Sequence, residues 1–108
     1  MEEIKKALEG KSLIVDLYST KYEVYFLVER YRTNGRAAID LFTKPENEPF
    51  ATLSVNIPDV ILKEREVLIK TWSENEKVAD AARKSGLFRD TGKRVSTGFV
   101  EAQIWEVI

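Results

Sequence analysis

Within residues 50–58, FATLSVNIP, apolar and polar side chains alternate from Ala51 up to Pro58. One side of this segment is apolar and consists of Ala51, Leu53, Val55 and Ile57. The other side is polar and consists of Thr52, Ser54 and Asn56. Because successive side chains point to opposite faces of a β-strand, this pattern predicts an antiparallel strand with one face on a core and one face in water. Proline cannot donate to a sheet ladder, so Pro58 should end the strand.

Other segments are rich in the β-branched and aromatic residues that favour strands. They cover residues 12–19, 22–32, 36–43, 66–72 and 99–108. Asn34 and Gly35 separate the second and third of these segments. Both residues tolerate the positive φ of a tight hairpin turn, so the dipeptide predicts a short turn between antiparallel strands. Pro45 and Pro49 mark a further turn, and the first four strands are therefore expected to form a meander.

Residues 73–86, SENEKVADAARKSG, give the strongest helix signal in the chain. Ser73 and Glu76 match the S-x-x-E capping pattern, in which the serine hydroxyl satisfies an amide of the first turn. The alanines in this segment favour the helix, and Gly86 can supply a left-handed stop. A shorter amphipathic helix is expected over residues 2–9.

Together these patterns predict a single α+β domain that spans residues 1–108. Its expected architecture is a mainly antiparallel sheet of five or six strands. A main helix over about residues 74–85 should pack on one face of the sheet, beside the short N-terminal helix. A chain of this length can bury a modest core without disulfides or metals.

Composition excludes several kinds of chemistry. The chain has no cysteine and no histidine, so disulfides, thiol nucleophiles, Cys/His zinc sites and imidazole bases are all absent. The formal net charge is −1, which argues against an obligate nucleic-acid binder. No apolar run approaches the roughly 20 residues of a membrane-spanning helix, and the charged start MEEIKKALEGK is unlike a signal peptide. We therefore expect a cytoplasmic protein.

Residues 85–101, SGLFRDTGKRVSTGFVE, contain three of the five glycines and suggest a phosphate-binding loop. A P-loop has four residues between its first glycine and Gly-Lys, followed by Ser or Thr. Here five residues separate Gly86 from Gly92-Lys93, and Arg94 occupies the hydroxyl position. The motif fails in spacing and in residue type. We interpret the segment as a solvated connection, with a turn inside it, between the main helix and the last strand.

Two groups of basic residues are candidates for binding. One surrounds the Asn-Gly turn. The other covers residues 84–94, in and next to the glycine-rich connection, where basic side chains exceed acidic ones by three. A basic loop can meet phosphates or an acidic partner, although exposed charge also serves solubility and discourages pairing between strand edges. The predicted partner-binding surface consists of Arg32, Arg36, Arg89, Lys93, Arg94 and Phe99.

Catalytic residues are harder to find. Four carboxylates lie in predicted strands, where two of them could face each other across neighbouring strands: Asp16, Glu29, Asp40 and Glu101. Without histidine and cysteine, the remaining options are a Ser-Lys pair or a divalent metal held by carboxylates. No motif supports either option, so we expect neither catalytic residues nor a cofactor.

Three stretches, NGRAAIDLF, EPFATLSVNIPD and TGKRVSTGFVE, carry a resemblance that covers about residues 31–101, roughly two-thirds of the chain. Through them the chain resembles a family of small proteins encoded on conjugative elements and phages of Gram-positive and gut bacteria. Thr97, between Ser96 and Gly98, departs from the commoner pattern of that family. The resemblance implies an accessory role in transfer, maintenance or counter-defence, and it brings no catalytic residues.

The leading hypothesis is a non-enzymatic protein that binds another protein through the predicted partner-binding surface. An alternative is nucleic-acid binding through the same basic residues, which would weaken steeply with salt. A further alternative is an enzyme that uses a carboxylate-held metal.

Overall fold

The computed structural model describes residues 1–108, and it confirms the α+β class. Its elements are α1 Glu2–Leu8, β1 Ser12–Leu17, β2 Thr20–Arg30, β3 Ala37–Thr43, β4 Pro49–Thr52, β5 Glu66–Ile69, a 3₁₀ turn Ser73–Asn75, α2 Glu76–Lys84, β6 Phe88–Thr97 and β7 Val100–Val107. No helix in this structure combines the length and the apolar character needed to cross a bilayer.

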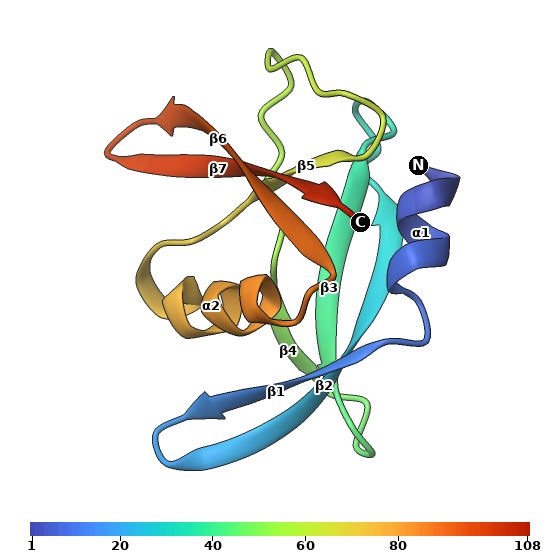
Figure 1. Ribbon diagram of the computed structural model, residues 1–108, viewed down its shortest axis with the longest axis vertical. Coiled ribbons are helices and arrows are strands. Elements are labelled where there is room, and N and C mark those ends of the chain that lie inside the picture. Colours follow the sequence, from blue (N-terminus) through green and yellow to red (C-terminus); the bar gives the residue numbers. More distant parts are fainter.

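The strands form two antiparallel sheets instead of the single sheet that was predicted (Figure 1). The first sheet has the order β1-β2-β3-β4, so the predicted meander of the first four strands is confirmed. The second sheet has the order β5-β7-β6. The structure has seven strands instead of the expected five or six, because the sequence of β6 predicts a connection and not a strand.

Residues 53–55 join the two sheets. The amide of Leu53 donates to the carbonyl oxygen of Ile39 in the first sheet at 2.9 Å, while Ser54 bridges Ile69 of β5. The amide of Val55 in turn donates to the carbonyl of Leu68 at 3.1 Å. The seven strands therefore form one curved wall in the order β1-β2-β3-β4-β5-β7-β6, with β1 and β6 at its two ends.

This junction corrects the prediction for residues 50–58. Strand β4 ends at Thr52, and Ser54 is buried instead of facing water. Its Oγ accepts the amide of Ile39 at 2.9 Å and lies 2.8 Å from the hydroxyl of Tyr31. A serine is tolerated there because both hydrogen bonds replace the water that it lost. The residues with the alternating pattern are therefore divided between β4 in the first sheet and a segment that pairs with β5 of the second sheet.

The main core lies inside the curved wall. It unites apolar residues of both sheets with Ile4 and Leu8 of α1 and with Val78 and Ala82 of α2. Helix α2 lies across the gap between the two ends of the wall and contacts both β1 and β6 (Figure 1). A smaller cluster around Leu68 covers the outer face of the second sheet, where the loop over residues 55–64 packs on it. The helix thus closes the opening that the strands leave.

The start of α2 differs from the predicted capping box. The α-helix covers Glu76–Lys84, and Ser73 belongs to the preceding 3₁₀ turn with φ +55° and makes no capping hydrogen bond. Asn75 is buried there, and its Nδ2 donates to the carbonyls of Thr52 at 2.7 Å and Lys70 at 3.1 Å. The asparagine therefore holds the ends of β4 and β5 to the start of the helix.

The Asn34-Gly35 turn is wider than predicted. Strand β2 ends at Arg30 and β3 begins at Ala37, and of the two turn residues only Gly35 has a positive φ. The amide of Gly35 donates to the carbonyl of Tyr31 at 2.8 Å, which closes a larger loop. Asn34 instead uses its side chain: Nδ2 donates to Oδ1 of Asn56 at 3.0 Å.

The segment predicted as a solvated connection is mostly strand. Residues Phe88–Thr97 form β6, which pairs with β7 along most of its length. Its register shifts between Asp90 and Arg94, where Gly92 takes φ +84°. The predicted turn is therefore a bulge within a hairpin, in which residues 91–93 of β6 lie opposite the single residue Ile104 of β7 and the strand kinks before pairing resumes.

Candidate partner-binding surface

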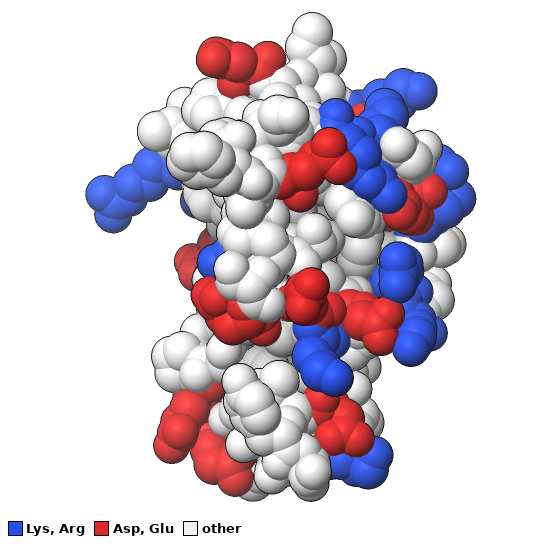
Figure 2. All heavy atoms as spheres, turned by 90° about the vertical axis from the view of Figure 1, so that its left-hand side faces the viewer, with Lys and Arg blue, Asp and Glu red and all other residues white.

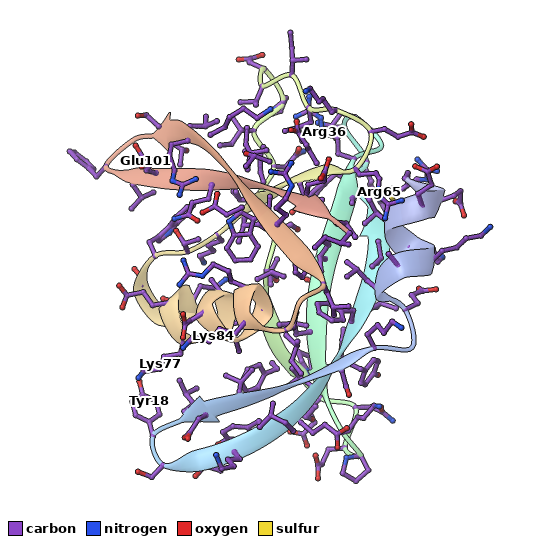
Figure 3. The ribbon with its side chains drawn as sticks, in the orientation of Figure 1. Tyr18, Arg36, Arg65, Lys77, Lys84 and Glu101 are labelled. Atoms are coloured by element: carbon purple, nitrogen blue, oxygen red, sulfur yellow. The ribbon has the colours of Figure 1, made fainter.

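The predicted site residues do not form one surface. Arg32 and Arg36 lie in the loop between β2 and β3, whereas Arg89, Lys93 and Arg94 lie on β6. Figure 3 shows Arg36 beside the loop over residues 55–64, away from the outer end of the β6–β7 hairpin, where Glu101 is labelled. The structure brings together the three residues on β6 and separates them from the other two arginines.

Arg36 has a structural role. Its guanidinium donates to the carbonyl oxygens of Ile57, at 3.1 Å, and Val60. These bonds hold the loop that covers the outer face of the second sheet. Arg32, in contrast, is exposed and takes part in none of the ion pairs of the molecule. Of the two, Arg32 alone offers a free charge to a partner.

Each basic residue of β6 is matched by a carboxylate. Arg89 contacts Glu106 at 3.1 Å across the hairpin, and Lys93 contacts Glu66 of β5 at 2.7 Å. Arg94 reaches back to both carboxylate oxygens of Asp90, at 2.9 Å each. The local positive excess seen along the sequence therefore largely disappears in three dimensions. Glu66 and Glu106 lie far from the basic segment in the sequence, so spacing alone could not reveal these pairs.

Glu66 is the one buried carboxylate in the molecule, with only 4% of its side chain exposed. Burial acts to raise the pKa of Glu66, but the amide of Lys63 at 2.9 Å and the ammonium of Lys93 outweigh it and lower that pKa. The pKa of Asp90 is lowered mainly by its hydrogen bonds from Arg94. Both carboxylates are thus held charged, and their ion pairs with Lys93 and Arg94 stabilise the bulge of β6.

Phe99 lies at the tip of the β6–β7 hairpin and is fully exposed. Thr97 pairs with Val100, so Gly98 and Phe99 form the two-residue turn, and Gly98 takes φ +67°. The hairpin projects from the body of the protein (Figure 1). An aromatic ring in this position contributes no packing to the fold.

A second exposed aromatic residue, Tyr18, lies at the tip of the β1–β2 hairpin. Tyr18 is 92% exposed and shares a two-residue turn with Ser19, because Leu17 pairs with Thr20. The β1–β2 and β6–β7 hairpins extend to the same side of the molecule, with α2 between them (Figure 1). Figure 2 looks onto this side, where uncharged atoms cover much of the upper and lower parts and a belt of acidic and basic side chains crosses the middle.

Two grooves flank α2 on this side. One, of about 540 Å³, lies between the helix and β7 and is lined by Gln103 and Trp105. The other, of about 620 Å³, lies between the helix and the β1–β2 hairpin. Ile14 and Tyr18 line this second groove from the hairpin, opposite Lys77 of the helix.

The carboxylates considered for catalysis do not form pairs. Across the sheets, Asp16 faces Lys21, Glu29 faces Ala38, Asp40 faces Leu27 and Glu101 faces Ser96. No group of three or more Asp and Glu side chains is close enough together to hold a metal ion.

Comparison with known proteins adds no assignment: no protein-family model matches the chain, and neither a curated protein nor a solved structure is significantly similar to it.

Proposed function

We propose that this chain is a non-enzymatic binding module whose target is another protein, and that the tip of the β6–β7 hairpin enters the interface. The observation that carries this proposal is Phe99, a fully exposed aromatic ring on a projecting turn. Aromatic residues are enriched in the buried centres of protein interfaces, where their large apolar area is removed from water. A ring that serves no packing in the free protein is well suited to that use.

The ion pairs on β6 support a protein target over a nucleic acid. Binding to nucleic acid draws on lysines and arginines that are free to neutralise phosphates. Arg89, Lys93 and Arg94 are each engaged with a carboxylate, so a phosphate would have to compete with Glu106, Glu66 and Asp90. The same pairs hold the hairpin in shape, which lowers the entropy lost when a partner binds.

We place this activity in the cytoplasm, in line with the composition. The resemblance to proteins of conjugative elements and phages suggests an accessory role in transfer, maintenance or counter-defence. A protein that binds a host or element protein can fill such a role.

A photo-crosslinking amino acid at position 99 tests the proposal directly. We expect the variant, produced in cells of its host, to crosslink to a discrete protein that mass spectrometry identifies. Phe99→Ser should then abolish co-purification of that protein while leaving the melting temperature unchanged, because the ring makes no internal contacts.

The matched control carries the same crosslinker in place of Ile61, another exposed apolar residue, which is 91% exposed on the loop over residues 55–64. Identical products from positions 99 and 61 would mean nonspecific capture. That result, or the absence of any product at position 99, would reject the hairpin tip as the binding site.

A further inference from the structure

The groove between α2 and the β1–β2 hairpin combines apolar surface with hydrogen-bond donors. Ile14 belongs to the outward face of β1 and is 57% exposed, although an alternating strand normally places polar residues there. Tyr18 and Ala81 complete the apolar lining. Figure 3 shows Tyr18 and Lys77 pointing toward each other from the hairpin and the helix. A bound segment would therefore meet both an apolar floor and a cation.

The backbone of the hairpin tip suggests that Tyr18 is there for a reason other than stability. Tyr18 and Ser19 have φ values of +51° and +65°, a region that glycine and asparagine occupy far more readily. Residues held in such conformations cluster at binding and catalytic sites. Here the strained turn places a tyrosine ring at the mouth of the groove, where it packs on nothing in the fold.

The charges of the groove are unbalanced in favour of cations. Asp16 is paired with Lys21, while the single carboxylate of Asp80 serves both Arg83 and Lys84 at 2.9 Å each. Lys77 is in none of the ion pairs. The groove and its direct ion-pair partners thus hold four cations against two carboxylates, within a chain whose formal net charge is −1. Counted in the same way, the groove on the other side of α2 has a smaller excess, because Lys77, Arg83 and the ion-pair partner Lys84 stand against Glu76 and Asp80.

We infer that the groove between α2 and the β1–β2 hairpin binds an acidic peptide segment that also carries an apolar side chain. The apolar side chain covers Ile14 and packs against the ring of Tyr18. The carboxylates of the peptide meet Lys77 and compete for Lys84, whose partner Asp80 is already shared with Arg83. This inference rests on the proposed function, since it names a class of partner and a second contact site on the same side of the protein.

Defined peptides provide the test. The full chain is titrated into fluorescently labelled eight-residue peptides in which Asp and Glu alternate with Leu and Phe, and into matched peptides with Asn and Gln instead. We expect the acidic peptides to bind at least tenfold more tightly, with an affinity that falls as salt is added because exposed charges are screened. A short single-stranded oligothymidine serves as a third probe.

Two variants locate the binding site. Lys77→Glu should weaken the binding of the acidic peptides by about tenfold or more. Lys6→Glu, which reverses the charge of an exposed and unpaired lysine of α1, should leave their affinity unchanged. Tyr18→Asn should weaken binding while keeping or raising the melting temperature, because asparagine suits the turn better. Ile61→Asn is its control, as an exposed apolar residue outside the groove.

Equal binding of acidic and neutral peptides, binding of oligothymidine alone, or an equal effect of Lys77→Glu and Lys6→Glu would each overturn the inference. If position 99 still crosslinks to a specific protein in that case, only the ligand class of the groove is wrong. If position 99 fails as well, the proposed function falls with it.

Discussion

At the scale of single residues, the turns of the two projecting hairpins place different residue types at positive φ. The β6–β7 turn uses Gly98 at its left-handed position, where glycine has no side chain to clash with the backbone. The β1–β2 turn places both Tyr18 and Ser19 at positive φ. Each such residue costs on the order of 1 kcal/mol or more. The second hairpin therefore gives up stability that a simple substitution can restore.

We predict that Ser19→Gly stabilises the protein by about 1 kcal/mol, because it removes one left-handed residue from the turn. The melting temperature should rise by about 4 °C. The free energy of unfolding, measured in urea, provides the check.

A substitution of the opposite kind, from glycine to alanine, can be made in the turn of the β6–β7 hairpin. Gly98→Ala introduces a side chain at φ +67°, where no heavy atom lies within 4 Å of the added Cβ, so only the backbone conformation is penalised. It should destabilise the protein by about 1 kcal/mol. A loss of stability in Ser19→Gly would show that the β1–β2 turn is not strained.

Residue types alone could not predict which basic side chains remain free. The sequence places Arg32, Arg36, Arg89, Lys93 and Arg94 in two basic segments, but it could not show that Arg36 binds backbone carbonyls or that Lys93 meets Glu66. Those partners depend on which strands become neighbours. Tyr18 was missed for a related reason, since a tyrosine in a strand-rich segment gives no sign that it forms the turn.

At the scale of elements, most strands and both helices followed from local patterns, and β6 did not. Its sequence, FRDTGKRVST, is rich in charged residues, lacks clean alternation and carries a glycine in the middle. Strand β6 is paired on one side only, at the end of the second sheet, and the bulge at Gly92 interrupts its register. Tertiary pairing with β7, together with side-chain bonds such as Arg94 to Asp90, supplies what local propensity lacks.

The contact between Glu66 and Lys93 links β5 to this weakly patterned strand, and it predicts a specific dependence on pH. The pKa of Glu66 is lowered from its ordinary value of 4.5. The charged carboxylate therefore stabilises the fold above about pH 4.5, and this contribution is lost as the pH falls through the lower, folded-state pKa. Glu66→Gln should cost about 1–2 kcal/mol at pH 7, and the difference from the unmodified protein should shrink on acidification.

Urea unfolding at a series of pH values from neutral to acidic measures both effects. Glu64→Gln, which changes an exposed neighbour that forms no ion pair, is the control and should behave as the unmodified protein. A Glu66→Gln deficit that stays constant down to the most acidic pH would show that the charge of Glu66 does not stabilise the fold.

At the scale of the whole molecule, the two sheets behave as one wall because they share a junction and a core. Leu53 and Ser54 connect β3 to β5 through hydrogen bonds, and the main core includes residues from both sheets and both helices. Neither sheet buries its inner face without the other. We therefore predict a single cooperative unfolding transition.

The two tryptophans provide local probes of this transition. Trp105 is buried in the main core, while Trp72 packs against the smaller cluster on the outer face of the second sheet. In Trp72→Phe, fluorescence reports Trp105 alone and should give the same urea midpoint as far-ultraviolet circular dichroism. Two separate midpoints would show that the sheets unfold independently.

The position of α2 has a consequence for self-association. Strands β1 and β6 are the two ends of the wall, and one helix of nine residues contacts both of them. An exposed edge strand is a template on which further chains can pair and start fibrils. Detachment of this single short helix would uncover two such edges in the same event. The charged residues and the bulge of β6 would still discourage pairing there, so the protection of β1 depends more strongly on this one small element.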